Sequence, residues 1–147
     1  MKKYIILLSI LFVPNFSFAQ KPFREMNDTD KAYVEKNFSI QPLKQEAFLA
    51  GQVFSCGIRS EKWVNYVLNY LIKNSENKVS SCLLFLIRNG YEPPFFEKNN
   101  QSILNNAAKN EIYKGFNLGK ISIFSKNDCN DAPLIANILD MKSGYIP

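Results

Sequence analysis

The sequence contains no histidine, the side chain that most often serves as a general base or a metal ligand. Catalytic arrangements that join histidine to serine or cysteine are therefore impossible. Ser75 and Lys78 reproduce the S-x-x-K spacing of penicillin-recognising enzymes, but the companion S-D-N and K-T-G motifs are missing. A helix start, with Ser75 as cap and Glu76 in the first turn, explains the same residues. A carboxylate pair could act as acid and base, but no spacing favours one, so we predict no enzyme and no catalytic residue.

The three cysteines, Cys56, Cys82 and Cys129, lie 26 and 47 residues apart and form no C-x-x-C motif. This spacing argues against a zinc or thioredoxin-like site, so we expect no metal and no cofactor. In an oxidising compartment one pair can be bridged. A Cys56–Cys129 bridge closes the longest loop, for which chain entropy gives about 4 kcal/mol against about 3.5 kcal/mol for Cys56–Cys82. Cys82 lies in an apolar run that suits a buried free thiol. We predict the pair Cys56–Cys129, with three buried unpaired thiols as the alternative.

The first residues, MKKYIILLSILFVPNFSFAQ, have the layout of a secretory signal peptide. Two lysines precede a run of ten apolar residues, and small residues stand before a cut after Ala19. A retained membrane anchor is the alternative, but a spanning helix needs roughly 20 apolar residues. We therefore predict a signal peptide over 1–19 and a single domain over 20–147, located in the periplasm or secreted.

The charge pattern bears on the class of partner. The chain has 18 basic and 13 acidic side chains and a formal net charge of +5, which falls to +3 when the two lysines of the signal peptide leave. The charges are interspersed, which is typical of a solvated surface rather than a nucleic-acid-binding one. We expect no nucleic-acid partner and no membrane insertion after cleavage, and we leave a homodimer open.

Apolar periodicity and capping residues predict an all-α domain of about five to six helices, arranged as a small bundle or an array of helical hairpins. A short strand or a turn is expected near 118–125. Three of the predicted helices stop at glycines, Gly90, Gly115 and Gly144. The predicted helices cover 27–38, 39–58, 60–74, 75–89, 100–114 and 130–143.

One predicted helix, 60–74, carries an aromatic stripe formed by Trp63, Tyr66 and Tyr70. A stripe with this spacing indicates a core-facing side, and a ligand-binding face is the alternative. In the preceding helix Gly51 costs about 1 kcal/mol relative to alanine, which indicates a close helix crossing.

The segment GYEPPFFEK, 90–98, is the most prominent non-helical stretch. Its large apolar side chains and its two prolines are typical of a stiff loop that anchors a partner. The alternative is a lid folded over the core. Our candidate partner-binding residues are Tyr91, Pro93, Pro94, Phe95 and Phe96.

Two resemblances to known families concern this chain. The stretch LLFLIRNGYEPPFFEKNNQSILNNAAKN, 83–110, resembles the join between two ankyrin repeats, although Gln101-Ser102-Ile103-Leu104 stands where that family has Thr-Pro-Leu-His. The plan of the whole chain resembles the small α-helical periplasmic immunity proteins of type VI secretion. These have a cleaved signal and cysteines in amphipathic helices, as around Cys56 in FLAGQVFSCGIRS.

The second resemblance implies an immunity protein that binds an incoming toxin and occludes its active site with a protruding loop or helix. The leading hypothesis is therefore a periplasmic protein-binding domain without catalysis. The alternative is a binding module for a small molecule or envelope ligand that uses the face of Trp63, Tyr66 and Tyr70. An ankyrin-like interaction module is a further option.

Overall fold

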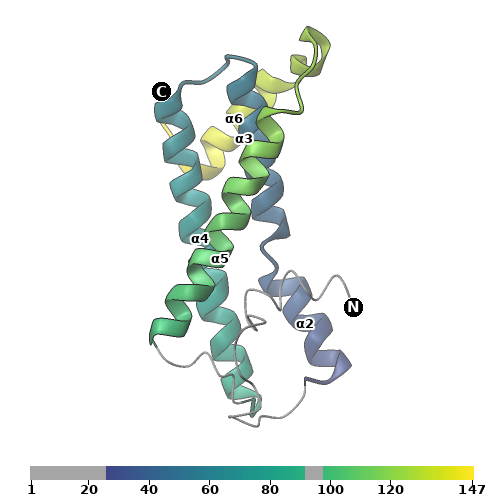
Figure 1. Ribbon diagram of the computed structural model, residues 1–147, viewed down its shortest axis with the longest axis vertical. Helices are drawn as coiled ribbons and strands as arrows, with labels where there is room; N and C mark the ends of the chain where they lie inside the picture. The colour runs from purple at the N-terminus through teal and green to yellow at the C-terminus, as the bar shows by residue number, and fades with distance from the viewer. Residues whose placement is uncertain (1–25, 92–97) are drawn as a thin grey trace. The chain divides into compact units, whose positions relative to one another are not determined.

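The computed structural model describes residues 26–91 and 98–147, and within these ranges no residue belongs to a strand (Figure 1). The all-α prediction is therefore confirmed for the described part of the chain. The predicted signal peptide, 1–19, lies outside it. Among the described residues, no helix combines the length and the apolar character that crossing a membrane requires. The elements are α2 (Asp28–Phe38), α3 (Gln41–Ser55), α4 (Glu61–Arg88), α5 (Lys98–Lys120), the 3-10 helix η2 (Lys126–Cys129) and α6 (Ala132–Ser143).

The two helices predicted over 60–74 and 75–89 are one helix, α4, of 28 residues. Ser75, which we expected to cap the second helix, lies inside α4 and is fully buried. Local sequence favoured a break there because serine is a common cap. No proline or glycine interrupts α4, and the burial of Ser75 inside the helix outweighs its preference for a capping position. The S-x-x-K pattern therefore lies in the middle of a helix.

The predicted end of a helix at Gly115 is wrong, because α5 continues through Gly115 and Gly119 to Lys120. Of the two alternatives expected near 118–125, the strand is absent and a turn follows α5 at 121–122. These glycines lie where the backbones of α5 and α3 approach each other closely. A Cβ atom on Gly115 would lie 2.5 Å from the carbonyl oxygen of Lys44, and one on Gly119 would collide with the carbonyl group of Phe48. Glycine serves here for close backbone approach and not as a helix stop.

Gly51 completes this contact from the side of α3. A Cβ atom on Gly51 would collide with the carbonyl oxygen of Phe116 and would lie 2.7 Å from the amide nitrogen of Lys120. The helix crossing that Gly51 predicted is therefore present. We call Gly51, Gly115 and Gly119 the glycine contact.

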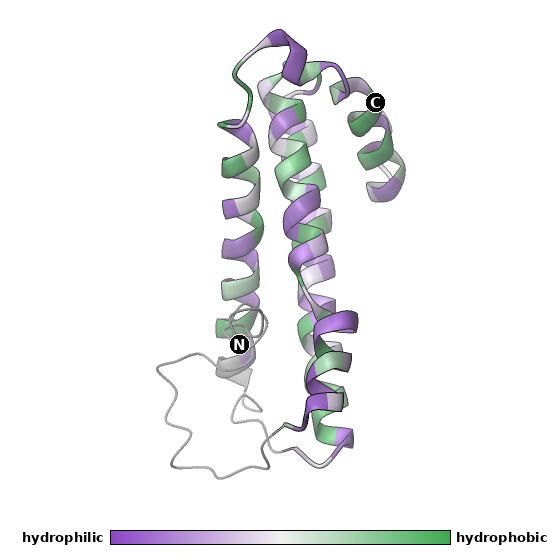
Figure 2. Ribbon diagram, turned by 90° about the vertical axis from the view of Figure 1, so that its right-hand side faces the viewer, coloured by the Kyte–Doolittle hydropathy of each residue, from purple (hydrophilic) through white to green (hydrophobic). Residues whose placement is uncertain are grey.

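The described residues form two compact units. Unit 1 contains α2, α4 from Ser75 onward and α5 up to Ala108, and unit 2 contains α3, the earlier part of α4, the later part of α5, η2 and α6. Hydrophilic and hydrophobic residues alternate along the helices, as expected when one side of a helix faces a core (Figure 2).

Unit 1 has a small apolar core. The rings of Tyr33 and Phe85 stack beside it with centroids 4.5 Å apart. The phenol group of Tyr91 donates a hydrogen bond to the carboxylate of Asp30 and accepts one from the backbone amide of Asn27. The buried residues of the apolar core of unit 1 are Met26, Val34, Ile40, Val79, Cys82, Leu83, Leu86, Tyr91, Leu104 and Ala108.

Unit 2 is built around Trp63, which is fully buried, and α3 packs directly against α6. Asp140 of α6 accepts a hydrogen bond from the indole nitrogen of Trp63 at 2.5 Å and one from Arg59 at 2.7 Å. These bonds secure α6 to the start of α4. The buried residues of the apolar core of unit 2 are Leu43, Ala47, Ala50, Val53, Trp63, Val64, Val67, Leu68, Leu71, Ile112, Phe116, Ala132, Ala136 and Leu139.

Three helices end at a glycine with positive φ: Gly57 after α3, Gly90 after α4 and Gly144 after α6. In each case the next amide bonds back to the carbonyl five residues earlier, as from Tyr91 to Leu86 and from Tyr145 to Asp140. The predicted helix ends at Gly90 and Gly144 are confirmed.

We predict that Gly119→Ala lowers the free energy of unfolding by about 2 kcal/mol or more, because its methyl group would collide with the backbone of α3. Urea unfolding of the oxidised protein measures this. The matched control is Asn117→Ala, an exposed position on the same helix, which should change stability by less than about 0.5 kcal/mol. Equal stability of the Gly119→Ala variant and the wild type would contradict the close approach of α3 and α5.

Candidate functional site

The predicted partner-binding loop, 90–98, lies largely outside the described residues, and Tyr91 is the one candidate partner-binding residue within them. Tyr91 is only 4% exposed and belongs to the core of unit 1. Its hydroxyl group is occupied by Asp30 and Asn27. Tyr91 therefore is not the exposed aromatic anchor that we expected. Pro93, Pro94, Phe95 and Phe96 remain sequence-based candidates.

The aromatic stripe of α4 does not form an open ligand face. Trp63 is fully buried and its indole nitrogen is bonded to Asp140. Tyr66 is 44% exposed and packs edge-on against Tyr145, with ring centroids 5.2 Å apart, while Tyr70 is half-buried beside the core of unit 2. The interpretation of the stripe as a core-facing side holds for Trp63.

A disulfide joins Cys56, which follows α3, to Cys129 at the end of η2. The two Cα atoms lie 5.6 Å apart, although the cysteines are separated by 73 positions in the sequence. Cys82 is a free thiol in the core of unit 1. The predicted pairing is thus the one that the structure contains.

The disulfide fastens the segment that links α5 to α6, residues 121–131, which we call the anchored loop. Near its start Gln52 donates a hydrogen bond to the Ser122 hydroxyl at 3.0 Å, and that hydroxyl donates one to the carbonyl of Gly119 at 2.7 Å. The Ser55 hydroxyl donates to the carbonyl of Lys120 at 2.6 Å. The start of the loop is therefore bonded to α3 and its end is covalently joined to the residue after α3.

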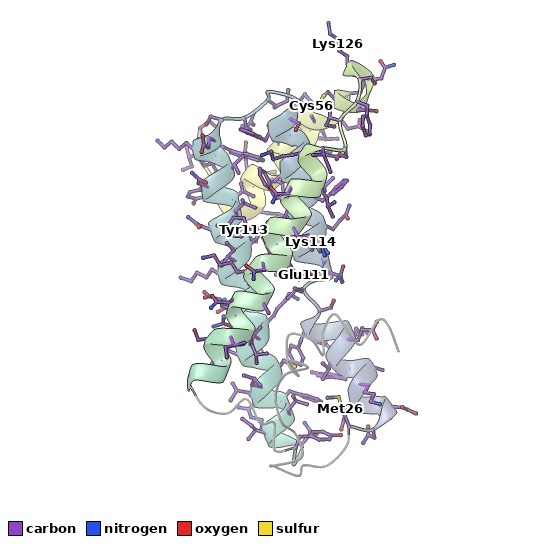
Figure 3. All side chains as sticks on the ribbon, viewed as in Figure 1. Met26, Cys56, Glu111, Tyr113, Lys114 and Lys126 are labelled. Atoms are coloured by element: carbon purple, nitrogen blue, oxygen red, sulfur yellow. A yellow bond between two sulfur atoms is a disulfide. The ribbon has the colours of Figure 1, made fainter. Side chains whose placement is uncertain are left out.

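The tip of the anchored loop is ordered by its own polar groups. The carboxylate of Asp128 accepts hydrogen bonds from the backbone amides of Phe124 at 2.9 Å and Ser125 at 3.1 Å. Asp128 thereby closes a turn at the start of η2. Figure 3 shows Lys126 at the far end of this loop, past the end of α5, with Cys56 near its base.

The anchored loop exposes large apolar side chains. Phe124 is 88% exposed and Ile121 is 69% exposed, and Leu118 on the last turn of α5 is 43% exposed. Lys120 lies between Leu118 and Ile121 in the sequence, and its ammonium group is over the ring of Phe116, 5.5 Å from the ring centroid. Exposed aromatic side chains on a held backbone are typical anchors of protein interfaces.

A second exposed apolar set lies on α6, where Leu134, Ile138 and Met141 are spaced four and three residues apart. By helical geometry this stripe is opposite the side formed by Ala132, Ala136 and Leu139, which is buried in unit 2. The helix therefore carries apolar residues on both sides.

Sequence reasoning missed Phe124 and Ile121 because we expected only a short strand or a turn near 118–125 and assigned it no binding role. The run SKNDCND, 125–131, contained a usable signal, since serine, asparagine and aspartate favour turns. Its cysteine was already assigned to the predicted bridge. Together these features could have indicated a loop that the disulfide fixes in place.

No group of three or more cysteine, aspartate or glutamate side chains in 26–91 and 98–147 is placed to hold a metal ion. Burial raises the pKa of the Cys82 thiol from 9.0 to about 12. A thiol that stays protonated is a poor nucleophile, so Cys82 has a packing role.

Comparisons of the chain with protein-family models, with curated proteins and with solved structures gave no match.

We predict that Cys82 makes stability fall at alkaline pH. Above pH 9 the thiol ionises in the unfolded chain but stays protonated in the folded one, so the unfolded state is favoured increasingly up to about pH 12. Relative to Cys82→Ala, the wild type should lose stability at a rate that approaches about 1.4 kcal/mol per pH unit as pH rises from 9 to 11. Urea unfolding of both proteins at pH 8, 9 and 10 measures the difference. A difference that does not change with pH would show that the thiol is solvated.

Proposed function

We propose that the protein is a periplasmic, non-catalytic protein-binding domain, and specifically an immunity protein that occludes the active site of a bacterial toxin. The anchored loop is the proposed plug. The observation that carries this proposal is the 88% exposed side chain of Phe124 on a loop that is bonded to α3 at its start and joined to Cys56 near its end.

The anchored loop has to gain little order when it binds a partner. Immobilising a loop and its side chains costs about 0.5–1.5 kcal/mol per side chain, and this cost lowers affinity. In the anchored loop the disulfide, the Gln52–Ser122 bond and the Asp128 turn already restrict the backbone. An exposed phenylalanine on such a backbone can enter an apolar pocket, and most of the free energy gained by burying its ring is then available for affinity.

The compartment is part of the proposal. A disulfide is most common in secreted and periplasmic proteins. The predicted signal peptide over 1–19 and the Cys56–Cys129 bridge support export independently of each other. The whole-chain resemblance is to immunity proteins of the same compartment.

The rival hypotheses have less support. A ligand module that uses Trp63, Tyr66 and Tyr70 would need an open face, but Trp63 is fully buried. An ankyrin repeat places two helices and a turn in about 33 residues, whereas α4 alone has 28 residues and α5 has 23. Protein binding through the anchored loop is the function that the described residues favour.

The direct test is capture of the partner. The mature protein, beginning at Gln20, is expressed in the periplasm of its native host with a C-terminal tag, and the eluate is identified by mass spectrometry. We expect one stoichiometric partner with a toxin-like hydrolase domain, whose activity the purified protein inhibits. A monodisperse protein that captures no partner and carries a small molecule through purification would instead favour the ligand module.

We predict that Ile121→Ala combined with Phe124→Ala weakens binding of the captured partner about 100-fold or more, because two interface anchors are lost. The melting temperature should change by less than about 2 °C, since both side chains are exposed. Isothermal titration calorimetry and thermal unfolding measure the two effects.

Two control variants make this test specific. Leu84→Ala removes an apolar side chain that is 51% exposed in unit 1 and should leave affinity unchanged. Phe95→Ala combined with Phe96→Ala tests the loop that the sequence predicted. If that variant alone lost binding, the interface would lie in 90–98, and the anchored loop would be rejected as the partner-binding site.

A further inference from the structure

We propose that Cys56 and Cys129 form an oxidation switch: the anchored loop takes its binding conformation only after a thiol–disulfide oxidant has joined the two cysteines. The consequence for partner binding rests on the function proposed above. The consequence for the loop itself does not, and it can be measured on the isolated protein.

The first support is that hydrophobic packing holds little of the anchored loop, since Cys129 is its one residue that packs against the apolar core of unit 2. None of its residues, 121–131, is buried, whereas Ala132, the first residue of α6, is 3% exposed. The loop has three large apolar side chains. Ile123 is half-buried, and Ile121 and Phe124 face solvent. A segment with so few buried contacts opens at low free energy unless another constraint acts on it.

The second support is the position of the covalent constraint. Polar bonds to α3 hold only the start of the loop, through Ser122 and the neighbouring Lys120. The turn closed by Asp128 is internal to the loop and connects it to no other element. At the end of the loop that leads into α6, the disulfide of Cys129 is therefore the attachment to the end of α3 among the described contacts. Breaking it frees the tip that carries Phe124.

The third support is that the chain sorts its cysteines by accessibility. Cys56 and Cys129 are both partly exposed, so an oxidant can reach them, whereas Cys82 is 1% exposed in the core of unit 1. Burial also raises the pKa of the Cys82 thiol to about 12, which suppresses the thiolate that exchange requires. Oxidation therefore yields one pairing without exchange to the third thiol.

The chemistry is a dithiol–disulfide exchange. The thiolate of one cysteine attacks a sulfur atom of the oxidant's disulfide, which forms a mixed disulfide and releases one thiol of the oxidant. The second cysteine of the pair then attacks the mixed disulfide and releases the other thiol. In balance the pair loses two electrons and two protons, and the oxidant's disulfide is reduced to two thiols.

It follows that the chain is an inactive binder where thiols stay reduced, and that export makes it competent. The cytoplasm keeps thiols reduced, whereas the periplasm supplies disulfide oxidants. The switch thus confines the rigid form of the loop to the compartment where we propose that the partner acts.

Hydrogen exchange of the backbone amides, followed by mass spectrometry, tests the switch on the mature protein alone. The same wild-type sample is compared before and after reduction with a phosphine. Amides of 121–131, including those of Phe124 and Ser125, should exchange about tenfold faster or more after reduction. Amides of α4 around Trp63 should change less than about twofold.

Two results would overturn the switch. Equal exchange of the loop in both states would show that polar bonds alone fix it. Equal acceleration across α3, α4 and the loop would show that the disulfide stabilises all of unit 2 and does not act on the loop. Cys82→Ala is the matched control and should keep the slow exchange of the oxidised wild type, because its Cys56–Cys129 pair is intact.

Affinity for the captured partner then separates the two proposals. Reduced wild type and the Cys56→Ser, Cys129→Ser variant should both bind about tenfold more weakly or worse than the oxidised protein. Fast exchange in the reduced loop with unchanged affinity would reject the binding consequence and the anchored loop as interface, while the loop's dependence on the bridge would stand.

Discussion

The close backbone approach of α3 and α5 is the constraint on which unit 2 depends. Gly51, Gly115 and Gly119 allow this approach because any larger residue would meet the backbone of the facing helix. As a consequence, α5 ends beside α3, where the Ser55 hydroxyl bonds the carbonyl of Lys120. The anchored loop therefore begins next to the end of α3, and Cys129 returns within disulfide range of Cys56. The glycine contact, the helix end and the bridge form one chain of causes.

The same arrangement explains why the anchored loop can be polar and exposed without being loose. Its start is bonded to α3, and near its end the disulfide joins Cys129 to Cys56. An elongated hydrophobic contact is not needed to hold the segment between these points. Apolar side chains such as Phe124 are consequently free to face solvent, where a partner can use them.

The features that the sequence predicted well are those with a local or an entropic cause. The helix ends at Gly90 and Gly144 follow from glycine's access to positive φ, and the bridge from Cys56 to Cys129 from loop entropy. Gly115 is also a glycine, but its role has a different cause, because it depends on contact with Lys44, 71 positions earlier in the sequence. Ser75 misled for a related reason: burial in a long helix overrode its capping preference. The exposure of Phe124 depends on the path of α5, which no local pattern revealed.

The distribution of the cysteines connects stability with the proposed binding role. In small proteins a disulfide often substitutes for a core that is too small. Here both units have their own apolar cores, and the bridge lies at the edge of unit 2 beside a loop with no buried residue. Cys56 and Cys129 pack against the apolar core around Trp63, and the crosslink between them also restricts the segment that this packing leaves unsupported. The free thiol of Cys82 is buried in the other unit and thus cannot compete for either partner of the bridge. This separation is what a rigid, exposed binding loop requires: a constraint that uses no apolar side chain, so that the apolar side chains remain available for a partner.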